Sequence, residues 1–265
     1  MTAILNGKNA TFPSMANNII LGDCIEVMQR IPDESIDIVI TSPPYNLLNS
    51  TGNGMKHKTK ASRWPNAALQ DGYEHHSDNM PYKEYIKWQQ HCLAEMFRII
   101  KQNGAIFYNN KNRIQSGVLE DRSIITYQLP LRQIITWQRA GGINFNDGYF
   151  LPVTEQIYLI CKPDFLLKPT KNKYTDVWYI PQESNNPHPA PFPLKIPDRI
   201  LESVAQETGI VLDPFGGSGT TAIAAIKHKW DFIHIDTSES YCTMALKRIN
   251  QEDWQNKDEK QITLW

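Results

Sequence analysis

The sequence predicts an α/β fold in which a mostly parallel sheet has helices on both faces. Short apolar runs typical of buried strands alternate along the chain with segments whose apolar residues recur at helical spacing. A glycine-rich turn joins one such strand to the helix that follows it, at 213–221. Strand–turn–helix units in alternation build parallel sheets covered on both faces. No internal repeat interrupts the pattern, so we expect one domain over 1–265.

The predicted strands are runs of four to six residues dominated by Ile, Val and Leu, or longer runs that alternate with polar residues. Glycine, proline or an acidic residue bounds most of them. We expect strands, in chain order, at 18–23, 35–41, 105–110, 133–139, 154–162, 209–213 and 231–236.

The predicted helices follow from apolar spacing and from their end signals. Between 82 and 101 the apolar residues fit one helix face, and Gln102-Asn103-Gly104 is expected to end that helix. Pro197 and Asp198 stand in the first turn of another. We expect helices at 24–31, 82–101, 196–208, 220–229 and 238–251.

Two segments lack periodicity. Residues 47–80 are rich in Gly, Asn, Ser and His and are too long for a passive connection, which indicates a functional loop. Residues 163–193 contain many prolines and are expected to form an irregular surface segment. We treat both segments as insertions in the single domain.

Composition limits the class of protein. The 265 residues are 41% hydrophobic and 21% charged, as in ordinary globular proteins. No apolar run approaches the length of a membrane span, and the N-terminus lacks the pattern of a signal peptide. The four cysteines show neither CxxC nor Cys/His ligand spacing, which favours reduced thiols in the cytoplasm and no metal site.

The net charge of −1 does not by itself indicate nucleic-acid binding, so such binding requires local basic patches. Both irregular segments contain lysines next to aromatic residues, and in isolation these would be solvated loops. The candidate basic residues are Lys56, Lys58, Lys60, Arg63, Lys171 and Lys173.

The glycine-rich turn DPFGGSGTT, residues 213–221, lets the backbone approach a ligand at a helix N-terminus. Its glycine spacing formally fits a dinucleotide site, and Asp236 ends the next strand, as ribose recognition requires. An NAD-dependent oxidoreductase therefore remains an alternative. No lysine follows Gly219, so a phosphate-cradling loop of the ATPase type fits poorly.

Three features favour a cationic cofactor without phosphate. Asp213 begins the turn, where a carboxylate repels pyrophosphate and suits an ammonium group. Only about fifty residues follow the turn, so earlier strands must complete the sheet. Asp23 ends the strand at 18–23 and could accept from an adenine amino group. Together these features indicate S-adenosylmethionine, and no metal is required.

The motifs TSPPY at 41–45 and DPFGGSGTT at 213–221 resemble the catalytic and cofactor motifs of bacterial DNA amino-methyltransferases. HPAPFP at 188–193 matches a third motif of that family, and the order of the motifs is like that of its β class. The resemblance covers about 18–250. It implies a circularly permuted, Rossmann-like methyltransferase fold with a seven-stranded sheet, and methylation of adenine N6 or cytosine N4 in duplex DNA.

By resemblance, the cofactor site would combine the glycine turn with acids at neighbouring strand ends. Asp213 and the turn would hold the methionine part, Asp236 the ribose and Asp23 the adenine amino group. The full set is Asp23, Phe192, Asp213, Phe215, Gly216, Gly217, Ser218, Gly219, Thr220, Thr221 and Asp236. Alternatively, Asp236 is a helix N-terminal acid and Phe192 a core aromatic residue.

The predicted catalytic residues are Ser42, Pro43, Pro44 and Tyr45. The amino group of a base is a poor nucleophile because its lone pair is delocalised, so two acceptors must localise it. The Ser42 hydroxyl and the Pro43 carbonyl would be these acceptors, and proline removes competing N–H donors. Tyr45 would stack on a base flipped out of the duplex. Alternatively, the prolines only end a strand beside a core tyrosine.

Serine at the first motif position leans towards cytosine N4, while the β-class order is common among adenine enzymes, so both bases remain open. DNA contacts are expected from Asn46, from the loop at 47–80 and from 163–187. By resemblance, residues 163–187 stand where β-class enzymes have their target-recognition region. The segment 163–187 is short for that task, so the loop at 47–80 or a homodimer would share recognition of the DNA sequence. The resemblance places the protein in a bacterial or phage cytoplasm, beside the nucleoid, with a cognate restriction endonuclease as a candidate partner.

Other classes remain open on sequence alone. A methyltransferase that acts on RNA or on a protein amide would use a similar proline turn. A non-catalytic DNA-binding module would not need Asp213 for its work.

Overall fold

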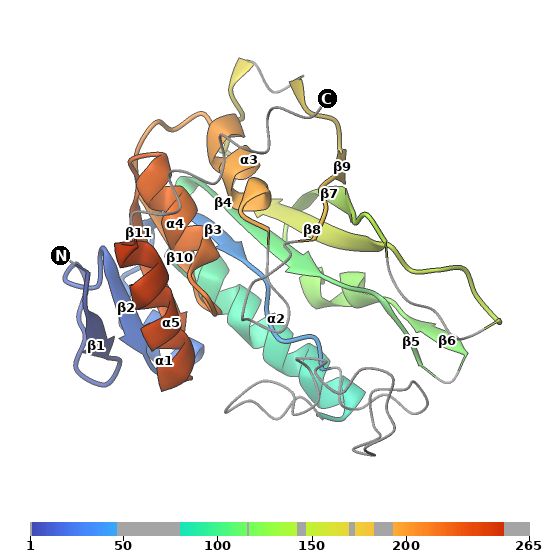
Figure 1. Ribbon diagram of the computed structural model, residues 1–265, viewed down its shortest axis with the longest axis horizontal. Helices are drawn as coiled ribbons and strands as arrows, with labels where there is room; N and C mark the ends of the chain where they lie inside the picture. The colour runs from blue at the N-terminus through green and yellow to red at the C-terminus, as the bar shows by residue number, and fades with distance from the viewer. Residues whose placement is uncertain are drawn as a thin grey trace.

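A nine-stranded mixed sheet forms the middle layer of the described structure (Figure 1). The computed structural model describes residues 2–46, 80–115, 117–141, 147–169, 173–182 and 193–251. Across the sheet the strands run in the order β1-β2-β11-β10-β3-β4-β8-β7-β9. Their bounds are β1 Ile4–Asn6, β2 Asn18–Leu21, β3 Ile36–Thr41, β4 Ile100–Asn110, β7 Leu131–Gln138, β8 Thr154–Cys161, β9 Val177–Tyr179, β10 Ile210–Asp213 and β11 Asp231–Asp236.

Strand direction divides the sheet into two parts. From β1 to β4 every neighbouring pair is parallel. Strand β8 runs antiparallel to both β4 and β7, and β9 is parallel to β7. The carboxyl ends of β2, β11, β10, β3 and β4 therefore lie along one edge, which we call the carboxyl edge. The same edge receives the first residues of β8 and the last residues of β7.

Helices cover both faces of the sheet, as predicted (Figure 1). One buried cluster combines the sheet with side chains of α1 (Cys24–Met28), α2 (Tyr82–Ile99) and the 3₁₀ helix η2 (Arg122–Thr126). The other combines it with α3 (Lys195–Ser203), α4 (Thr220–Lys227) and α5 (Glu239–Asn250). A strand turns successive side chains to opposite faces, which is why both faces are apolar here.

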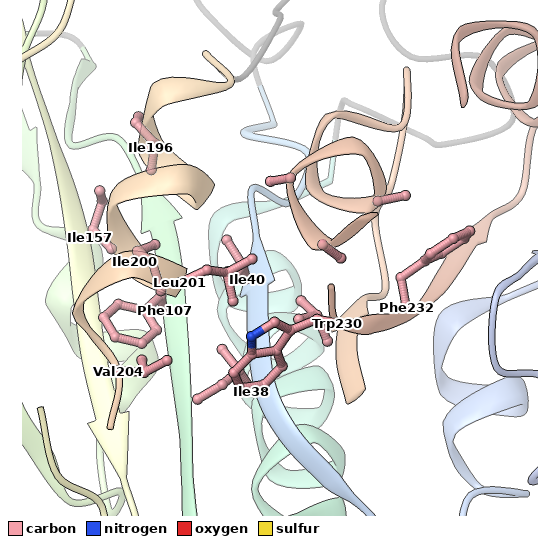
Figure 2. Close-up of a cluster of buried hydrophobic side chains, with 14 of the residues drawn as sticks. Ile38, Ile40, Phe107, Ile157, Ile196, Ile200, Leu201, Val204, Trp230 and Phe232 are labelled. Atoms are coloured by element: carbon pink, nitrogen blue, oxygen red, sulfur yellow. The ribbon is translucent and has the colours of Figure 1, made fainter. Parts of the chain in front are cut away.

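Strand β3 illustrates this division. Ile38 and Ile40 belong to the cluster on the α3–α4–α5 face, whereas Val39 belongs to the cluster on the α1–α2 face. Figure 2 shows α3 directing Ile196 and Ile200 towards Phe107 and Ile157 of the sheet. All of these side chains are at least 97% buried. Burial on both faces fixes β3 and, with it, the position of the turn that follows.

The structure corrects the predicted number of strands and several ends. We predicted seven strands, and β1 and β9 add one at each edge of the sheet. Strands β1 and β9 have three residues each, which is too short for an alternating apolar pattern to be recognised. In addition, β9 lies inside the proline-rich segment 163–193, which we expected to be irregular. Helix α2 ends at Ile99 instead of near residue 101, because β4 begins at once and pairs Ile100 with Ile36.

One small element was not predicted, and the end of one predicted helix was wrong. Strands β5 (Arg113–Gln115) and β6 (Val118–Glu120) form an antiparallel hairpin separate from the main sheet. Helix α3 is shorter than expected, since it ends at Ser203 where Val204 takes an extended conformation. The four cysteines are buried and form no disulfide. Among the described residues, no helix is both long enough and apolar enough to cross a membrane.

Candidate active site

The proline turn and the glycine turn lie side by side at the carboxyl edge. We call Ser42–Asn46, after β3, the proline corner, and Asp213–Gly219, after β10, the glycine corner. Strands β3 and β10 are paired neighbours, with Leu212 opposite Val39. At their ends the Thr41 hydroxyl donates to Asp213 Oδ1 over 2.7 Å. Two motifs separated by more than 160 residues in sequence are thus linked by one buried hydrogen bond.

Asp213 is the buried acid between the two corners. Its side chain accepts from the hydroxyls of Thr41 (2.7 Å) and Thr221 (2.6 Å) and from the Phe215 backbone N–H (3.1 Å). Burial nevertheless raises the pKa of Asp213 from 3.8 to about 6, against the effect of these three donors, and the nearby Asp236 raises it further. No lysine, arginine or histidine among the described residues forms an ion pair with Asp213.

The glycine corner needs glycine for two different reasons. Gly217 and Gly219 have φ of +50° and +82°, a region that side chains disfavour. Gly216 is required by space, because a Cβ there would lie 2.2 Å from the ring of His234. His234 is fully buried, and burial lowers its pKa to about 3, so its ring is neutral and acts as packing beneath the turn.

Side chains from other elements fix the glycine corner. Arg248 of α5 donates to the Ser218 carbonyl over 2.6 Å and to its hydroxyl over 2.7 Å. The Gly217 N–H donates to Asp236 Oδ2 over 2.9 Å. The ring of Phe215 packs edge-on against Trp88 of α2, with ring centroids 5.7 Å apart. The turn is therefore held by contacts with three other elements of the protein.

The two remaining predicted acids both stand at the carboxyl edge. Asp236 ends β11 and accepts from the backbone N–H groups of Gly217 and Ser238. It does not cap α5, because the Ser238 hydroxyl does so by accepting from Tyr241. Asp23 is exposed and is the N-cap of α1, where its Oδ1 accepts from two backbone N–H groups. All of these hydrogen bonds are to the protein itself, so cofactor binding by Asp23 and Asp236 stays a prediction.

The proline corner is held from below by a network of buried polar groups. Tyr45 is 8% exposed, and its hydroxyl lies 2.7 Å from Ser42 Oγ and 3.0 Å from Glu155 Oε2. Asn109 Nδ2 donates to the Tyr45 hydroxyl over 2.5 Å and to Glu155 Oε2 over 2.9 Å. On the other side of the corner, the Tyr85 hydroxyl donates to the Pro44 carbonyl over 3.0 Å.

Glu155 is a buried acid that interacts with two basic side chains. It is 6% exposed, and its Oε1 lies 3.7 Å from Arg139 Nε. Lys111, which follows β4, is the second cation. Burial lowers the pKa of Lys111, as does the charge of Arg139, while the charge of Glu155 raises it. The proline corner therefore has its own compensated carboxylate, distinct from the acids of the glycine corner.

The side chain of Asn46, which we predicted to contact DNA, forms hydrogen bonds with the protein backbone. It is 2% exposed, and its side-chain amide exchanges two hydrogen bonds of 2.7 Å with the backbone of Met80. Its carbonyl accepts from Arg113 over 2.5 Å. Asn46 thus joins the two ends of the 47–79 segment. Lys173 lies 2.8 Å from Glu202 in an exposed ion pair. The other predicted contacts lie outside the described residues, namely Phe192, Lys56, Lys58, Lys60, Arg63 and Lys171.

Sequence reasoning missed Asn109, Glu155, Trp88 and Arg248. Asn109 had a signal, since two asparagines end the apolar strand β4 just as polar residues end β3 and β10. Glu155 had none, because it begins a strand, and only the antiparallel direction of β8 brings that start to the carboxyl edge. Trp88 and Arg248 stand on helices, where their spacing fits ordinary packing or solvated positions.

A family model described as DNA methylase, for methylation at N6 or N4, matches residues 36–247. The type II methyltransferase M2.MboI of Moraxella bovis is 27% identical over 93% of this chain and 94% of that protein. M.BglII of Bacillus subtilis is 26% identical over 94% of this chain and 73% of that protein.

Two solved structures share the fold. The PvuII DNA methyltransferase, described as cytosine-N4-specific, superimposes with a TM-score of 0.69 at 18% identity, covering 91% of this chain and 89% of that one. The complex of M1.HpyAVI with S-adenosylmethionine gives a TM-score of 0.57 at 19% identity, covering 88% and 98%. The predicted fold class is confirmed by these likenesses.

Proposed function

We propose, from the premise that this chain belongs to the N6/N4 family of DNA methylases, that its two corners divide the work of one methyl transfer. The glycine corner binds S-adenosylmethionine, and the proline corner accepts the exocyclic amino group of a base flipped from duplex DNA. The observation that supports this division is the 2.7 Å hydrogen bond from Thr41 to Asp213, which fixes one corner beside the other.

The glycine corner suits the cofactor through its charge. Asp213 is a buried acid with no ion pair among the described residues, and Asp236 stands at the next strand end. A ligand with an ammonium and a sulfonium group offsets such negative charge, whereas a pyrophosphate would increase the repulsion. When bound, S-adenosylmethionine supplies an electrophilic methyl group and departs as a neutral thioether. This charge argument also disfavours the NAD-dependent oxidoreductase considered above.

Each cofactor-binding residue then has a separate task. Asp213 contributes negative charge from beneath, since three of its four acceptor positions are already used by protein donors. Asp236, the last residue of β11, would accept from ribose hydroxyls, and Asp23, which follows β2, would accept from the adenine amino group. The backbone of Gly216 to Gly219 would hold the methionine part beside Phe215, and Phe192, outside the described residues, stays a predicted contact.

The proline corner binds and orients the base. The Ser42 hydroxyl and the Pro43 carbonyl accept from the two N–H groups of the target amine, which localises the nitrogen lone pair. The hydrogen bonds of the Tyr45 hydroxyl fix its ring, which stacks on the flipped base for about 1–3 kcal/mol. Pro44 is held by Tyr85, so the corner does not have to reorganise when the base enters.

The test is to incubate the protein with methyl-labelled S-adenosylmethionine and unmethylated plasmid DNA, and then to digest the DNA to nucleosides. We expect label in N6-methyladenosine or N4-methylcytidine of the deoxy series, which also decides between the two bases. Parallel reactions contain RNA or a protein mixture. Label in those substrates and none in DNA would transfer the proposal to the RNA or protein-amide class. Cofactor binding without any transfer would favour the DNA-binding module.

Partners follow from the same reaction. The substrate is double-stranded DNA, which would be contacted by the 47–80 loop and by 163–187. The relatives named above are type II methyltransferases, so we propose a restriction–modification role with a cognate endonuclease, in the cytoplasm of a bacterium. A homodimer would compensate for the short recognition segment, and sedimentation with and without DNA tests it.

A further inference from the structure

We propose that Glu155 is the terminal proton acceptor of the reaction, reached from Ser42 through the Tyr45 hydroxyl. This inference rests on the proposed function. It addresses a requirement of the chemistry, because an amino nitrogen that gains a methyl group becomes cationic and must lose one proton. A serine hydroxyl can take that proton only if its own proton moves to another acceptor.

The hydrogen bonds define a direction for this transfer. Glu155 Oε2 is an acceptor when ionised, so the single proton of the Tyr45 hydroxyl is donated to it over 3.0 Å. Tyr45 then has only lone pairs to offer Ser42, and the 2.7 Å contact must be a donation from Ser42 Oγ. One lone pair of Ser42 is approached by Asn109 Nδ2 over 3.4 Å, and the other is left for the amino group of the base. The network presents Ser42 as an acceptor before the base arrives.

Asn109 supports the same direction. Its Nδ2 donates to the Tyr45 hydroxyl and to Glu155 Oε2, at 2.5 and 2.9 Å, and also lies 3.4 Å from Ser42 Oγ. The reverse orientation of the amide would place its oxygen against the carboxylate, which would be repulsive. Asn109 therefore orients the lone pairs of Tyr45 and the carboxyl group of Glu155. It has no proton to exchange and acts by positioning the other members.

The burial of Glu155 keeps a proton acceptor next to the proline corner. A carboxylate that is 94% buried costs free energy unless it is compensated. Arg139 at 3.7 Å and the charge of Lys111 provide part of this compensation. Removing the carboxylate would leave the two cations without that charge, so the variants below are chosen to separate this structural role from proton acceptance.

The transfer is balanced in protons and charge. The nitrogen lone pair forms the bond to the methyl carbon, and the electron pair of the broken carbon–sulfur bond stays with sulfur. The amino group passes one proton to Ser42 Oγ, Ser42 passes its own to Tyr45, and Tyr45 passes its own to Glu155. One cation and one carboxylate are thereby replaced by neutral groups. Glu155 returns its proton to water after the product leaves.

Two variants test the relay against a structural role. Tyr45→Phe removes only the hydroxyl, and Glu155→Gln keeps the shape and one acceptor but cannot take the proton. Glu95→Gln is the matched control, since it removes a carboxylate from a partly buried pair with Arg98 near the end of α2, at the opposite edge of the sheet. All proteins are full-length, and thermal unfolding checks that each is folded.

Single-turnover methylation should slow by about 100-fold or more in both relay variants, with no change in the control. The double variant should be about as slow as either single variant, because both interrupt one path. Cofactor affinity by calorimetry and the fluorescence of 2-aminopurine at the target position, which reports flipping, should remain at wild-type values. Glu155→Asp, which keeps a carboxylate, should recover part of the rate.

The outcomes separate the relay from the function on which it depends. A Glu155→Gln protein that methylates at the wild-type rate overturns the relay alone. A loss of cofactor affinity or flipping in proportion to the rate also overturns it, since Glu155 would then only support the fold. If Glu155→Gln fails to fold, Tyr45→Phe is decisive by the same criteria. A wild-type protein that binds the cofactor but labels no DNA overturns the proposed function, and the relay with it.

Discussion

The glycine corner and the proline corner end neighbouring strands, yet they are stabilised in opposite ways. The glycine corner is held through its backbone, whose N–H and carbonyl groups bond to Asp236 and Arg248. The proline corner offers few backbone donors, and the side chains of Ser42 and Tyr45 bond instead to Asn109 and Glu155. Backbone binding suits a cofactor that is the same in every cycle. A corner without spare donors suits an amine that must find only acceptors.

This comparison predicts that changes at the proline corner alter the rate and leave cofactor affinity unchanged. Tyr45→Ala removes both the stacking ring and the relay hydroxyl, so turnover should fall by about 1000-fold. Rapid-quench methylation and calorimetry measure the two quantities separately. A variant with equal turnover would remove Tyr45 from the site, and one with weakened cofactor binding would contradict the division of work.

The acid that links the corners predicts a pH dependence of stability. The pKa of Asp213 is about 6 in the folded protein and 3.8 ordinarily, so between these values the folded state binds more protons than the unfolded state. The contribution of Asp213 to the free energy of unfolding is therefore fully present below pH 3.8 and is lost as the pH rises through 6. The loss is about 3 kcal/mol at most, as an order of magnitude.

Asp213→Asn is the matched comparison for this effect. Its oxygen can accept from Thr41 and from the Phe215 N–H, and its amide can donate to Thr221. Urea unfolding at several values between pH 4 and 7 should show the wild type losing stability relative to this variant as the pH rises. Parallel curves for the two proteins would show that Asp213 does not titrate in this range.

At the glycine corner the expected effect is on affinity. Asp236→Ala should weaken cofactor binding by about 10- to 100-fold, the value of one or two hydrogen bonds to a carboxylate. Turnover at saturating cofactor should change little. Asp231→Ala, at the other end of the same strand, is the control. If the cofactor affinity of Asp236→Ala is unchanged, Asp236 only stabilises the glycine corner and does not bind the cofactor.

The smallest predicted effect lies outside both corners. Lys173 is exposed and paired with Glu202, and we expect it to contact a DNA phosphate. Lys173→Ala should reduce the slope of log affinity against log salt by about 0.9, with turnover on saturating DNA unchanged. Fluorescence anisotropy at several salt concentrations measures the slope. An unchanged slope would place Lys173 outside the DNA interface.

The sequence by itself determined the parallel part of the sheet and the two corners. Apolar runs that end in polar residues are local signals, and in parallel strands such ends meet at one edge, which is why Ser42, Asp213 and Asp236 could be grouped without coordinates. The same local logic placed glycine where φ is positive. It also identified Pro197 and Asp198 in the first turn of α3.

Only the tertiary structure decided what lies beneath the proline corner. Glu155 begins its strand, and nothing in the sequence near it shows that β8 runs antiparallel to β4. Strand direction depends on pairing between segments distant in the chain, and so does the meeting of Glu155 with Tyr45, which are 110 positions apart. The sheet edge was a local prediction, whereas the proton path at that edge depends on long-range pairing.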